Sequence, residues 1–486
     1  MALTLKDPSL LATKAYINGE WVDSDDGSTF DVLNPATGEL IAKVASCGGA
    51  EARRAIEAAN AAQPAWAKRT AKERADILHR WADLIVENAD DLAVIMTVEQ
   101  GKILAEAKGE VVYSASFITW FAEEGRRVYG DVIPTNANDR RLIAIKQPVG
   151  VVAAITPWNF PAAMLTRKAG PALAVGCTFI MKPAKETPLS ANALCVLAER
   201  AGIPKGVVNL VCGSSASAIG NELTGNPLVR KVTFTGSTPV GKLLLAQSAQ
   251  TVKKVSMELG GNAPVIVFDD ADLDRAVAGA AAAKYRNAGQ TCICANRILV
   301  QDTIYDAFVE KFSKVVAGYK VGNGLEKGIH IGPLIHEKAA ADVIGMVDDA
   351  VKDGAKVAVG GKRHALGGAF LEPTVLTDVN PSMRVFREEI FGPVAPVFKF
   401  SSEEEAIRMA NDTEFGLAAY LYTGNMGRAF RVSEGIEYGM VGINETAISS
   451  EVIPFGGVKE SGLGREGSKY GVDDYLEIKL LCLGGL

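Results

Sequence analysis

Histidine is scarce in this chain of 486 residues, and none of its four histidines stands beside a cysteine or an acidic residue at the spacing of metal ligands. We therefore expect no metal site. The same scarcity weakens any scheme that pairs a serine or a cysteine with a histidine, so a carboxylate is the expected activator of a nucleophile. The histidines are His79, His330, His336 and His364.

Long apolar runs and an excess of one charge are also absent. No window reaches the ~18 apolar residues of a membrane helix, and Met1–Pro8 contains no apolar stretch of signal-peptide length. The 51 basic and 57 acidic side chains give a net charge of −6, which argues against a nucleic-acid partner. We expect a cytoplasmic protein that binds neither membranes nor nucleic acids.

Cysteine is sparse and odd in number, with seven residues. Cys177, Cys195 and Cys212 lie in apolar runs. This pattern favours reduced thiols over the disulfide framework of a small secreted protein.

The pattern along the chain predicts an α/β protein of about two or three domains. From Gly49 to Gly130 apolar residues recur at helical spacing. Short β-rich runs then alternate with helices, which predicts a parallel, doubly wound sheet. After Gly261 the alternation restarts and continues to Asn444, which predicts a second α/β domain. The predicted strands of the first sheet are Val149–Ile155, Cys177–Lys182, Val207–Cys212 and Lys231–Thr235.

Two further segments, Arg141–Lys146 and Tyr475–Leu483, alternate polar and apolar residues and predict peripheral strands. Strands of this kind leave open edges that need a cover. Either a second subunit or another part of the same chain is expected to supply it.

Cys292 and Glu258 are the candidate nucleophile and base. Cys292 stands among small and polar residues in Arg286–Cys294, which is typical of a reactive thiol, and a buried core cysteine is the competing interpretation. Glu258 lies in an apolar segment that ends in glycines. Burial there raises the pKa of a carboxyl and makes it a candidate proton acceptor, while a solvated glutamate is the alternative.

Two strand ends are candidate nucleotide sites. Lys231–Thr235 runs into a glycine turn between Gly236 and Gly241 and then into a helix, so backbone N–H groups can approach a phosphate. The spacing is neither the dinucleotide fingerprint nor a P-loop, and a plain turn competes with this interpretation. Lys182 and Lys185 follow another predicted strand, where they are expected to reach ribose hydroxyls and a phosphate, or else to be solvated.

A series of motifs, in the same order and across nearly the whole chain, resembles the aldehyde dehydrogenase superfamily. These motifs are Pro157–Pro161, Lys182–Ala184, Phe234–Ser237, Met257–Gly261, Gly289–Cys292, Glu389–Pro393 and Pro454–Lys459. Other segments are similar to the succinate-semialdehyde dehydrogenases within that superfamily. These segments are Thr166–Gly170, Lys284–Cys294 and Gly462–Gly471.

The resemblance implies a fold with a Rossmann-type cofactor domain, an α/β catalytic domain and a small β oligomerisation arm. It also implies a homodimer or a homotetramer. The expected bounds are 1–126 and 147–258 for the cofactor domain, 259–459 for the catalytic domain, 127–146 and 472–486 for the arm, and 460–471 for a connecting segment.

The resemblance also implies the roles of the site residues. Cys292 attacks the aldehyde carbon, the Asn159 amide and the Cys292 backbone N–H stabilise the oxyanion, and hydride is transferred to the nicotinamide. Glu258 then activates the water that hydrolyses the thioester. Glu389 is implied to hold the nicotinamide ribose, Phe391 to pack near the ring and Ser237 to contact the diphosphate. The implied cofactor residues are Ile155, Thr156, Trp158, Lys182, Lys185, Gly236, Ser237, Glu389 and Phe391.

A small aldehyde with a distal carboxylate needs a fixed cation, and arginine binds carboxylates in a bidentate manner. Arg167 and Arg286 are the candidates, with structural salt bridges as the alternative, and the resemblance adds Ser449 or Ser450. The expected substrate is succinate semialdehyde. Glutarate semialdehyde or another short semialdehyde stays an alternative, because one methylene is worth only about 0.8 kcal/mol of burial.

Lys185 and Cys294 carry two further expectations. Many NAD-specific relatives have a glutamate where this chain has Lys185, and a cation there favours a 2′-phosphate, so we expect NADP+ to be preferred over NAD+. Cys294 follows the nucleophile closely. In some semialdehyde dehydrogenases such a pair forms a reversible disulfide, and an inert neighbour is the alternative.

Two rival functions share this fold. A CoA-acylating aldehyde dehydrogenase would release the acyl group to a thiol, and Glu258 argues against it because hydrolysis needs that base. A non-catalytic nucleotide-binding protein is the second rival. The joint presence of Asn159, Glu258 and Cys292 argues against that one.

Overall fold

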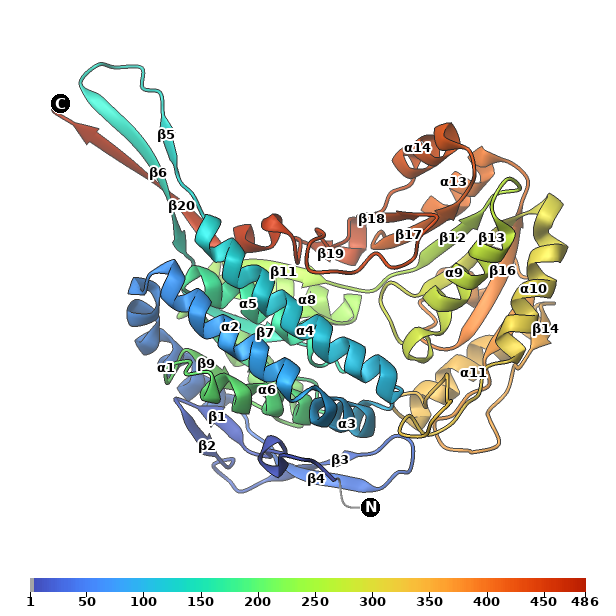
Figure 1. Cartoon of the computed structure of the whole chain (residues 1–486), viewed down its shortest axis with the longest axis horizontal. Coiled ribbons are helices and arrows are strands. Elements are labelled where there is room, and N and C mark those ends of the chain that lie inside the picture. Colours follow the sequence, from blue (N-terminus) through green and yellow to red (C-terminus); the bar gives the residue numbers. More distant parts are fainter. Residues whose placement is uncertain (1–3) are drawn as a thin grey trace.

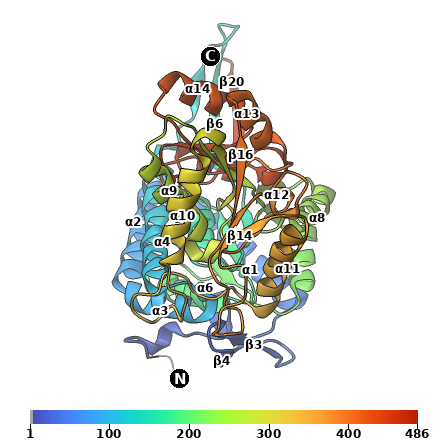
Figure 2. The same ribbon diagram turned by 90° about the vertical axis from the view of Figure 1, so that its right-hand side faces the viewer.

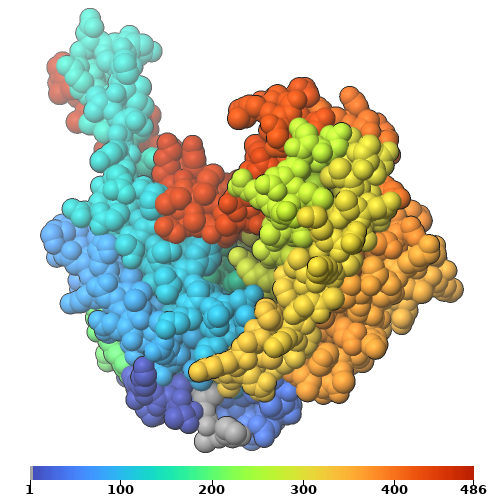
Figure 3. Space-filling model, turned by 45° about the vertical axis from the view of Figure 1, so that its right-hand side comes forward, coloured from blue at the N-terminus to red at the C-terminus, as the bar shows by residue number. Residues whose placement is uncertain are grey.

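The computed structural model describes residues 4–486 and shows two α/β bodies and a projecting arm (Figure 1; Figure 2). The first body contains an eight-stranded sheet, the second a seven-stranded sheet and the arm a three-stranded sheet. In the space-filling view the arm stands away from both bodies (Figure 3). Among residues 4–486 no helix is both long and apolar enough to cross a membrane.

The eight-stranded sheet is parallel in its centre and antiparallel at its edges. The central strands from β11 to β9 are parallel, whereas β19, β1 and β2 pair antiparallel. In spatial order the strands are β19 (Gly462–Leu463), β11 (Lys254–Glu258), β10 (Val229–Thr235), β7 (Val151–Ile155), β8 (Thr178–Lys182), β9 (Val208–Leu210), β1 (Ala15–Ile17) and β2 (Glu20–Val22).

Helices cover both faces of this sheet, and the side chains of β7 show why. Val152 and Ala154 pack with the helices of one face, while Val151, Ala153 and Ile155 belong to the core of the other. A strand buried on both faces reads as a continuous apolar run, which β7 does. The first face carries α2 (Ala71–Glu87), α3 (Ala89–Gln100), α4 (Leu104–Glu124), α5 (Ala163–Val175) and α6 (Pro188–Arg200); the second carries α1 (Gly49–Lys68), α7 (Ala216–Gly225) and α8 (Thr238–Ser248).

The second body repeats this design around a sheet that is parallel except for β14. Its strands, in spatial order, are β14 (Lys356–Val359), β15 (Thr374–Thr377), β16 (Val394–Phe400), β13 (Ala295–Gln301), β12 (Ala263–Val267), β17 (Ala418–Tyr422) and β18 (Met440–Ile443). Its helices are α9 (Leu273–Tyr285), α10 (Tyr305–Ala317), α11 (Glu337–Lys352), α12 (Arg384–Arg387), α13 (Glu403–Asn411) and α14 (Met426–Gly435).

The arm is an antiparallel sheet in the order β20 (Leu476–Gly484), β6 (Arg140–Pro148), β5 (Asp131–Ile133). Several of its apolar side chains are exposed, among them Ile478 at 74% and Val132 at 77%, whereas Ala144 and Leu476 are buried. A separate hairpin, β3 (Thr29–Leu33) with β4 (Leu40–Ala45), lies near the N-terminus.

The structure confirms the predicted α/β fold and corrects two expectations. The first sheet is not parallel throughout, because short strands from the N-terminal region and from Gly462–Leu463 pair antiparallel at its edges. The strand expected at Arg141–Lys146 is not peripheral, because β6 pairs on one side with β5 and on the other with the C-terminal strand β20. The expectation that a second subunit covers an arm edge stays a prediction.

Candidate active site

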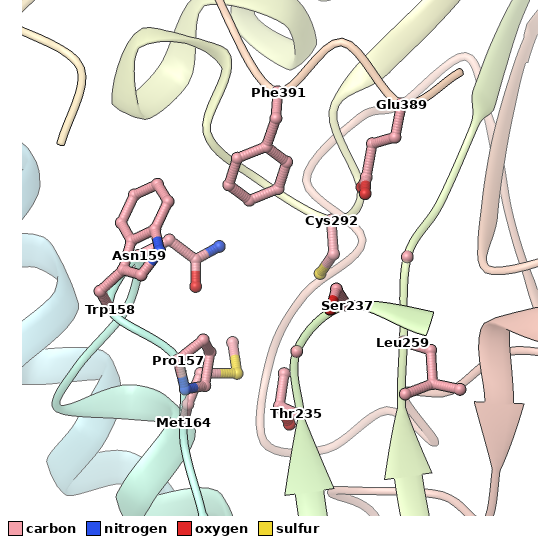
Figure 4. Close-up of a pocket in the computed structure, with 12 residues that line it drawn as sticks. Pro157, Trp158, Asn159, Met164, Thr235, Ser237, Leu259, Cys292, Glu389 and Phe391 are labelled. Carbon is pink, nitrogen blue, oxygen red and sulfur yellow. The ribbon is translucent and has the colours of Figure 1, made fainter. Parts of the chain in front are cut away.

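A cavity of about 260 Å³ lies where loops of the two bodies meet (Figure 4). Strand ends of the first sheet supply one wall, and the segments around Cys292 and Glu389 supply the other. Its lining residues are Pro157, Trp158, Asn159, Met164, Thr235, Gly236, Ser237, Leu259, Gly260, Cys292, Glu389 and Phe391.

The register of the first sheet explains why distant residues converge here. In the parallel pairs Ile155 lies opposite Lys182, and Thr235 lies opposite Glu258, each at the carboxyl end of its strand. Carboxyl ends of neighbouring parallel strands share one edge of the sheet, which is where open α/β sheets bind ligands. The sequence therefore brings the loops after β7, β8, β10 and β11 to one place.

Cys292 is held by close backbone packing. A Cβ on Gly261 would lie 2.2 Å from the Cys292 carbonyl oxygen, so only glycine fits there. In Figure 4 the Cys292 side chain points into the cavity. Burial is the main cause that raises the pKa of its thiol to about 12, and the Glu389 carboxylate acts in the same direction. Arg167 and Arg286 lower that pKa.

The segment before Cys292 has an unusual backbone. Asn287, Ala288 and Gly289 all have positive φ, at 50°, 55° and 78°. For residues other than glycine this conformation is unfavourable by roughly 1 kcal/mol or more each. The surrounding contacts must therefore stabilise Asn287 and Ala288 in it.

Asn159 faces Cys292 from the first body. Its Nδ2 donates to the Gln290 carbonyl oxygen at 3.0 Å, which leaves the second amide hydrogen for a ligand. Its own carbonyl oxygen accepts from Lys102 Nζ at 2.8 Å and from Asn287 Nδ2 at 3.0 Å. Within residues 4–486 the Cys292 backbone N–H makes no backbone hydrogen bond. Both predicted oxyanion donors thus have a hydrogen to offer.

Glu258 lies beside the cavity rather than in its lining. The residue is 3% exposed, and its Oε2 has no hydrogen-bond partner among the described residues. Burial raises the pKa of Glu258 well above its usual range, and the Glu466 carboxylate raises it further. The predicted desolvated carboxyl is present.

A buried ion-pair cluster lies next to Glu258 and was not predicted. Glu466 pairs with Lys168, which also donates to Thr235 Oγ1 at 2.6 Å, and with Arg167 at 3.0 Å. Burial acts to raise the pKa of Glu466, but the two cations outweigh it and hold that pKa below its usual range. The pKa values of these two neighbouring carboxyls are therefore shifted in opposite directions, that of Glu466 downward and that of Glu258 upward.

The cofactor candidates divide between the cavity and its surroundings. Glu389 accepts from the Gly261 N–H at 3.1 Å, and burial raises the pKa of its carboxyl to about 8. The Trp158 and Phe391 rings meet edge to face at 5.6 Å. Ser237, the residue before α8, lines the cavity and makes no side-chain capping hydrogen bond, so the first turn of α8 has N–H groups without a capping side chain.

The other cofactor candidates lie at the same edge of the first sheet but do not line the cavity. They are Ile155, Thr156, Lys182 and Lys185. Lys182 is buried, donates to the Pro183 carbonyl oxygen at 3.0 Å, and has a pKa lowered by burial. Lys185 is exposed and makes no ion pair among residues 4–486. Ile155 and Thr156 are buried at the end of β7, where the Thr156 N–H donates to the Lys182 carbonyl oxygen at 3.1 Å.

The candidate substrate arginines are in different environments. Arg286 is exposed, stacks on Phe160 at 5.1 Å and makes no ion pair within the described chain. Arg167 is 1% exposed, stacks on Phe455 at 3.9 Å and is paired with Glu466, although its Nη2 has no hydrogen-bond partner among the described residues. The salt-bridge alternative therefore applies to Arg167 and not to Arg286.

Ser449 lies beside Arg286, and Ser450 does not share that position. A cavity of about 220 Å³ contains both Arg286 and Ser449 in its lining, together with Tyr113, whose hydroxyl is 2.5 Å from Ser449 Oγ. Arg286 also lines a second cavity of about 200 Å³. Ser450 lines neither.

Cys294 is buried, and its thiol is not part of a disulfide. All seven cysteines are free thiols. Cys294 Sγ is 3.4 Å from the Lys284 carbonyl oxygen, to which it donates, and burial raises the pKa of its thiol. A redox role for Cys294 stays a prediction.

The sequence did not reveal several buried or half-buried charged residues around the site. One sequence pattern pointed to part of this set, because Lys102, Glu106 and Glu110 recur at helical spacing. Charged residues on an exposed helix face show the same spacing, so the pattern does not identify a buried cluster. Glu466 gave no local signal, since its partners Arg167 and Lys168 are far away in the sequence.

The fold and the site define a two-body α/β enzyme with a cysteine at the junction of the bodies. The sequence profile described as "Aldehyde dehydrogenase family" matches residues 21–481. A glutarate-semialdehyde dehydrogenase of Pseudomonas aeruginosa is 63% identical over 100% of both chains. A succinate-semialdehyde dehydrogenase (NADP+) of Escherichia coli is 61% identical over 99% of this chain and 100% of its own.

Solved structures agree with these sequence relatives. The crystal structure of a succinate-semialdehyde dehydrogenase from Burkholderia pseudomallei superimposes with a TM-score of 0.98 at 62% identity, over 99% of this chain and 100% of that one. The chain belongs to the aldehyde dehydrogenase family, and its activity is that of an aldehyde dehydrogenase.

The raised pKa of Cys292 predicts a steep pH dependence of thiol reactivity. With a pKa of about 12 the reactive thiolate is a minor species at neutral pH, and its fraction grows with pH. Alkylation of Cys292 by iodoacetamide in cofactor-free protein should therefore accelerate about tenfold per pH unit between about pH 7 and pH 9. Mass spectrometry of the Cys292 peptide measures the rate, and a plateau within that range would contradict the prediction.

Proposed function

We propose that the protein oxidises a short semialdehyde to the dicarboxylic acid through a covalent intermediate on Cys292. The observation that carries this proposal is the placement of the Cys292 thiol opposite the Asn159 amide in one cavity (Figure 4). The thiol loses its proton to solvent, Sγ of the thiolate forms a bond to the aldehyde carbon, and the electron pair of the C=O π bond moves to the oxygen, which becomes an oxyanion. The free hydrogen of Asn159 Nδ2 and the Cys292 backbone N–H stabilise it.

The proposed cofactor is a nicotinamide dinucleotide, which accepts the hydrogen and electron pair that leave the aldehyde carbon. The residues of this site fit such a group. The first turn of α8 has no capping side chain and can bind a phosphate, while Glu389 can accept from ribose hydroxyls. Trp158 and Phe391 form an aromatic wall beside Cys292.

The thioester left on Cys292 is proposed to be hydrolysed by a water that Glu258 deprotonates. A base near neutral pH needs a raised carboxyl pKa, and Glu258 has one. The attack of water forms the new C–O bond, the C–S bond breaks, and Sγ recovers a proton. The first body is then the cofactor domain and the second the catalytic domain.

The proposed substrate class is an aldehyde with a distal carboxylate, with succinate semialdehyde first and glutarate semialdehyde as the alternative. The exposed, unpaired Arg286 guanidinium beside Ser449 supports an anionic substrate. The relatives reported above are named for both semialdehydes. The buried Nη2 of Arg167, which has no hydrogen-bond partner among the described residues, is a second place for a carboxylate oxygen.

Replacement of the nucleophile and of the base should separate the two chemical stages. Cys292→Ala removes the attacking sulfur and should abolish aldehyde-dependent absorbance at 340 nm, while cofactor binding persists. Glu258→Gln leaves acylation intact and should slow turnover about 100-fold or more, with one burst of reduced cofactor per subunit. Stopped-flow absorbance measures both, and turnover by Cys292→Ala would reject the proposal. Acyl-CoA formation on addition of coenzyme A would instead support the acylating alternative.

Lys185 is proposed to favour NADP+ over NAD+. Its exposed ammonium can pair with a 2′-phosphate. Lys185→Glu should lower kcat/KM for NADP+ by about 10–100-fold and leave NAD+ within about threefold, because a charged hydrogen bond is replaced by repulsion. Steady-state kinetics with both cofactors decide this. A strong preference of the wild-type protein for NAD+ would contradict it.

Arg286 is proposed to select the carboxylate of the substrate. Arg286→Met should raise KM for succinate semialdehyde by about 10–100-fold and leave KM for butyraldehyde within about twofold. Arg275→Met is the matched control, because Arg275 lies on α9, the helix that ends just before Arg286, and lines neither Arg286 cavity. Equal effects on the charged and the neutral aldehyde would contradict the assignment.

A further inference from the structure

Three charged residues, one just before α4 and two in its first two turns, have no role in the chemistry proposed above. Lys102, Glu106 and Glu110 recur with helical spacing, and the side chains of Lys102 and Glu110 are each 1% exposed. Burying charges is unfavourable unless they are paired and hydrogen-bonded. The contacts of Lys102 and Glu110 therefore indicate why these two side chains are buried; Glu106, between them in the sequence, is half-buried.

Lys102 and Glu110 hold the loop that carries Asn159. Lys102 Nζ is 2.5 Å from Glu110 Oε2 and donates to the Asn159 carbonyl oxygen at 2.8 Å. The other carboxylate oxygen of Glu110 accepts from the N–H groups of Ala162 and Ala163, at 3.0 and 3.2 Å. One ion pair thus fixes both the middle of the loop between β7 and α5, at Asn159, and its end at the start of α5.

Glu106 reaches the other body and holds the loop that carries Cys292. Both of its carboxylate oxygens accept from the Asn287 backbone N–H, each at 3.1 Å. Asn287 is the first residue of the positive-φ segment that leads to Cys292. Its side chain donates to the Asn159 carbonyl oxygen at 3.0 Å and to the Gln290 carbonyl oxygen at 3.2 Å.

The two loops are therefore joined through one short segment of the first body. The Leu104 N–H also crosses to the second body, where it donates to the Gly324 carbonyl oxygen at 2.9 Å. A left-handed backbone at Asn287 and Ala288 persists only when its neighbours enforce it. Glu106 supplies the acceptor that the Asn287 N–H meets in this conformation.

We propose that Glu106 is a positioning residue that fixes the Cys292 loop against the Asn159 loop by accepting the Asn287 N–H. The inference rests on the proposed role of Cys292 as nucleophile. Without the carboxylate, the segment relaxes toward commoner backbone conformations, and the thiol moves relative to the Asn159 amide. A displacement of about 1 Å in such a site lowers turnover by about 100-fold.

Glu106→Ala and Glu106→Gln separate the hydrogen bond from the charge. The alanine variant should lose about 30-fold in kcat and about tenfold in the rate at which iodoacetamide alkylates Cys292. The glutamine variant keeps an acceptor oxygen and should stay within about threefold of wild type in both rates. Alkylation of cofactor-free protein is the deciding measurement, because Glu106 also lines the Arg286 cavity and can alter KM for the aldehyde.

Ala288→Gly tests the mechanism of the loss. Glycine adopts positive φ without penalty, so Glu106→Ala/Ala288→Gly should recover about fivefold or more of the alkylation rate lost in Glu106→Ala. Glu51→Ala is the matched control. Glu51 is buried and accepts from the backbone N–H groups of Asp25 and Gly48 at 2.8 Å each, remote from the cavity. Glu51→Ala should lower Tm as Glu106→Ala does, and it should leave kcat and the rate of Cys292 alkylation unchanged.

A wild-type alkylation rate in Glu106→Ala, or no recovery in the double variant, would overturn the proposal. If Glu106→Ala does not fold, Glu106→Asp is tested instead. The aspartate side chain is one methylene shorter, so its carboxylate lies farther from the Asn287 N–H. The aspartate variant should then alkylate more slowly than the glutamine variant, and the reverse order overturns the proposal. Turnover by Cys292→Ala would reject the proposed function itself, whereas an inactive Cys292→Ala with normal Glu106 variants rejects the positioning role alone.

Discussion

The active site depends on one close approach of backbone, where Gly261 passes against the Cys292 carbonyl oxygen with no space for a side chain. Gly289 makes a similar contact, since a Cβ there would lie 2.2 Å from the Gly392 carbonyl oxygen. These contacts bind the nucleophile loop to segments that leave β11 and precede β16. The position of Sγ is therefore set by backbone packing, and the side chains around it act on a fixed atom.

The charges around that atom shift the pKa values of two neighbouring carboxyls in opposite directions. Arg167 and Lys168 pair with Glu466 and lower its pKa, whereas burial raises the pKa of Glu258 beside it. Pairs of titratable groups with pKa values pushed apart are typical of acid and base sites. The arginine buried under the site thus serves the electrostatics of the base, whatever it contributes to substrate binding.

Much of the fold could be predicted from the sequence, because its central strands are continuous apolar runs buried on both faces, as β7 and β8 show. The antiparallel edges could not, since β19 has two residues and carries no periodic signal. Cys292 and Glu258 stood out by their local setting. Glu466 and the left-handed Asn287 did not, because the first acts through a partner distant in sequence and the second through backbone geometry that residue type does not indicate.

The environment of Arg286 limits how finely the site can select its substrate. An exposed guanidinium without a fixed partner can follow a carboxylate over a range of positions, because no hydrogen bond of its own must be broken. Such a cation strongly favours an anionic substrate but distinguishes neighbouring chain lengths only through apolar burial, at about 0.8 kcal/mol per methylene. That difference is about fourfold in kcat/KM. Strict discrimination of chain length must therefore come from the shape of the path between Arg286 and Cys292, and not from the charge at its end.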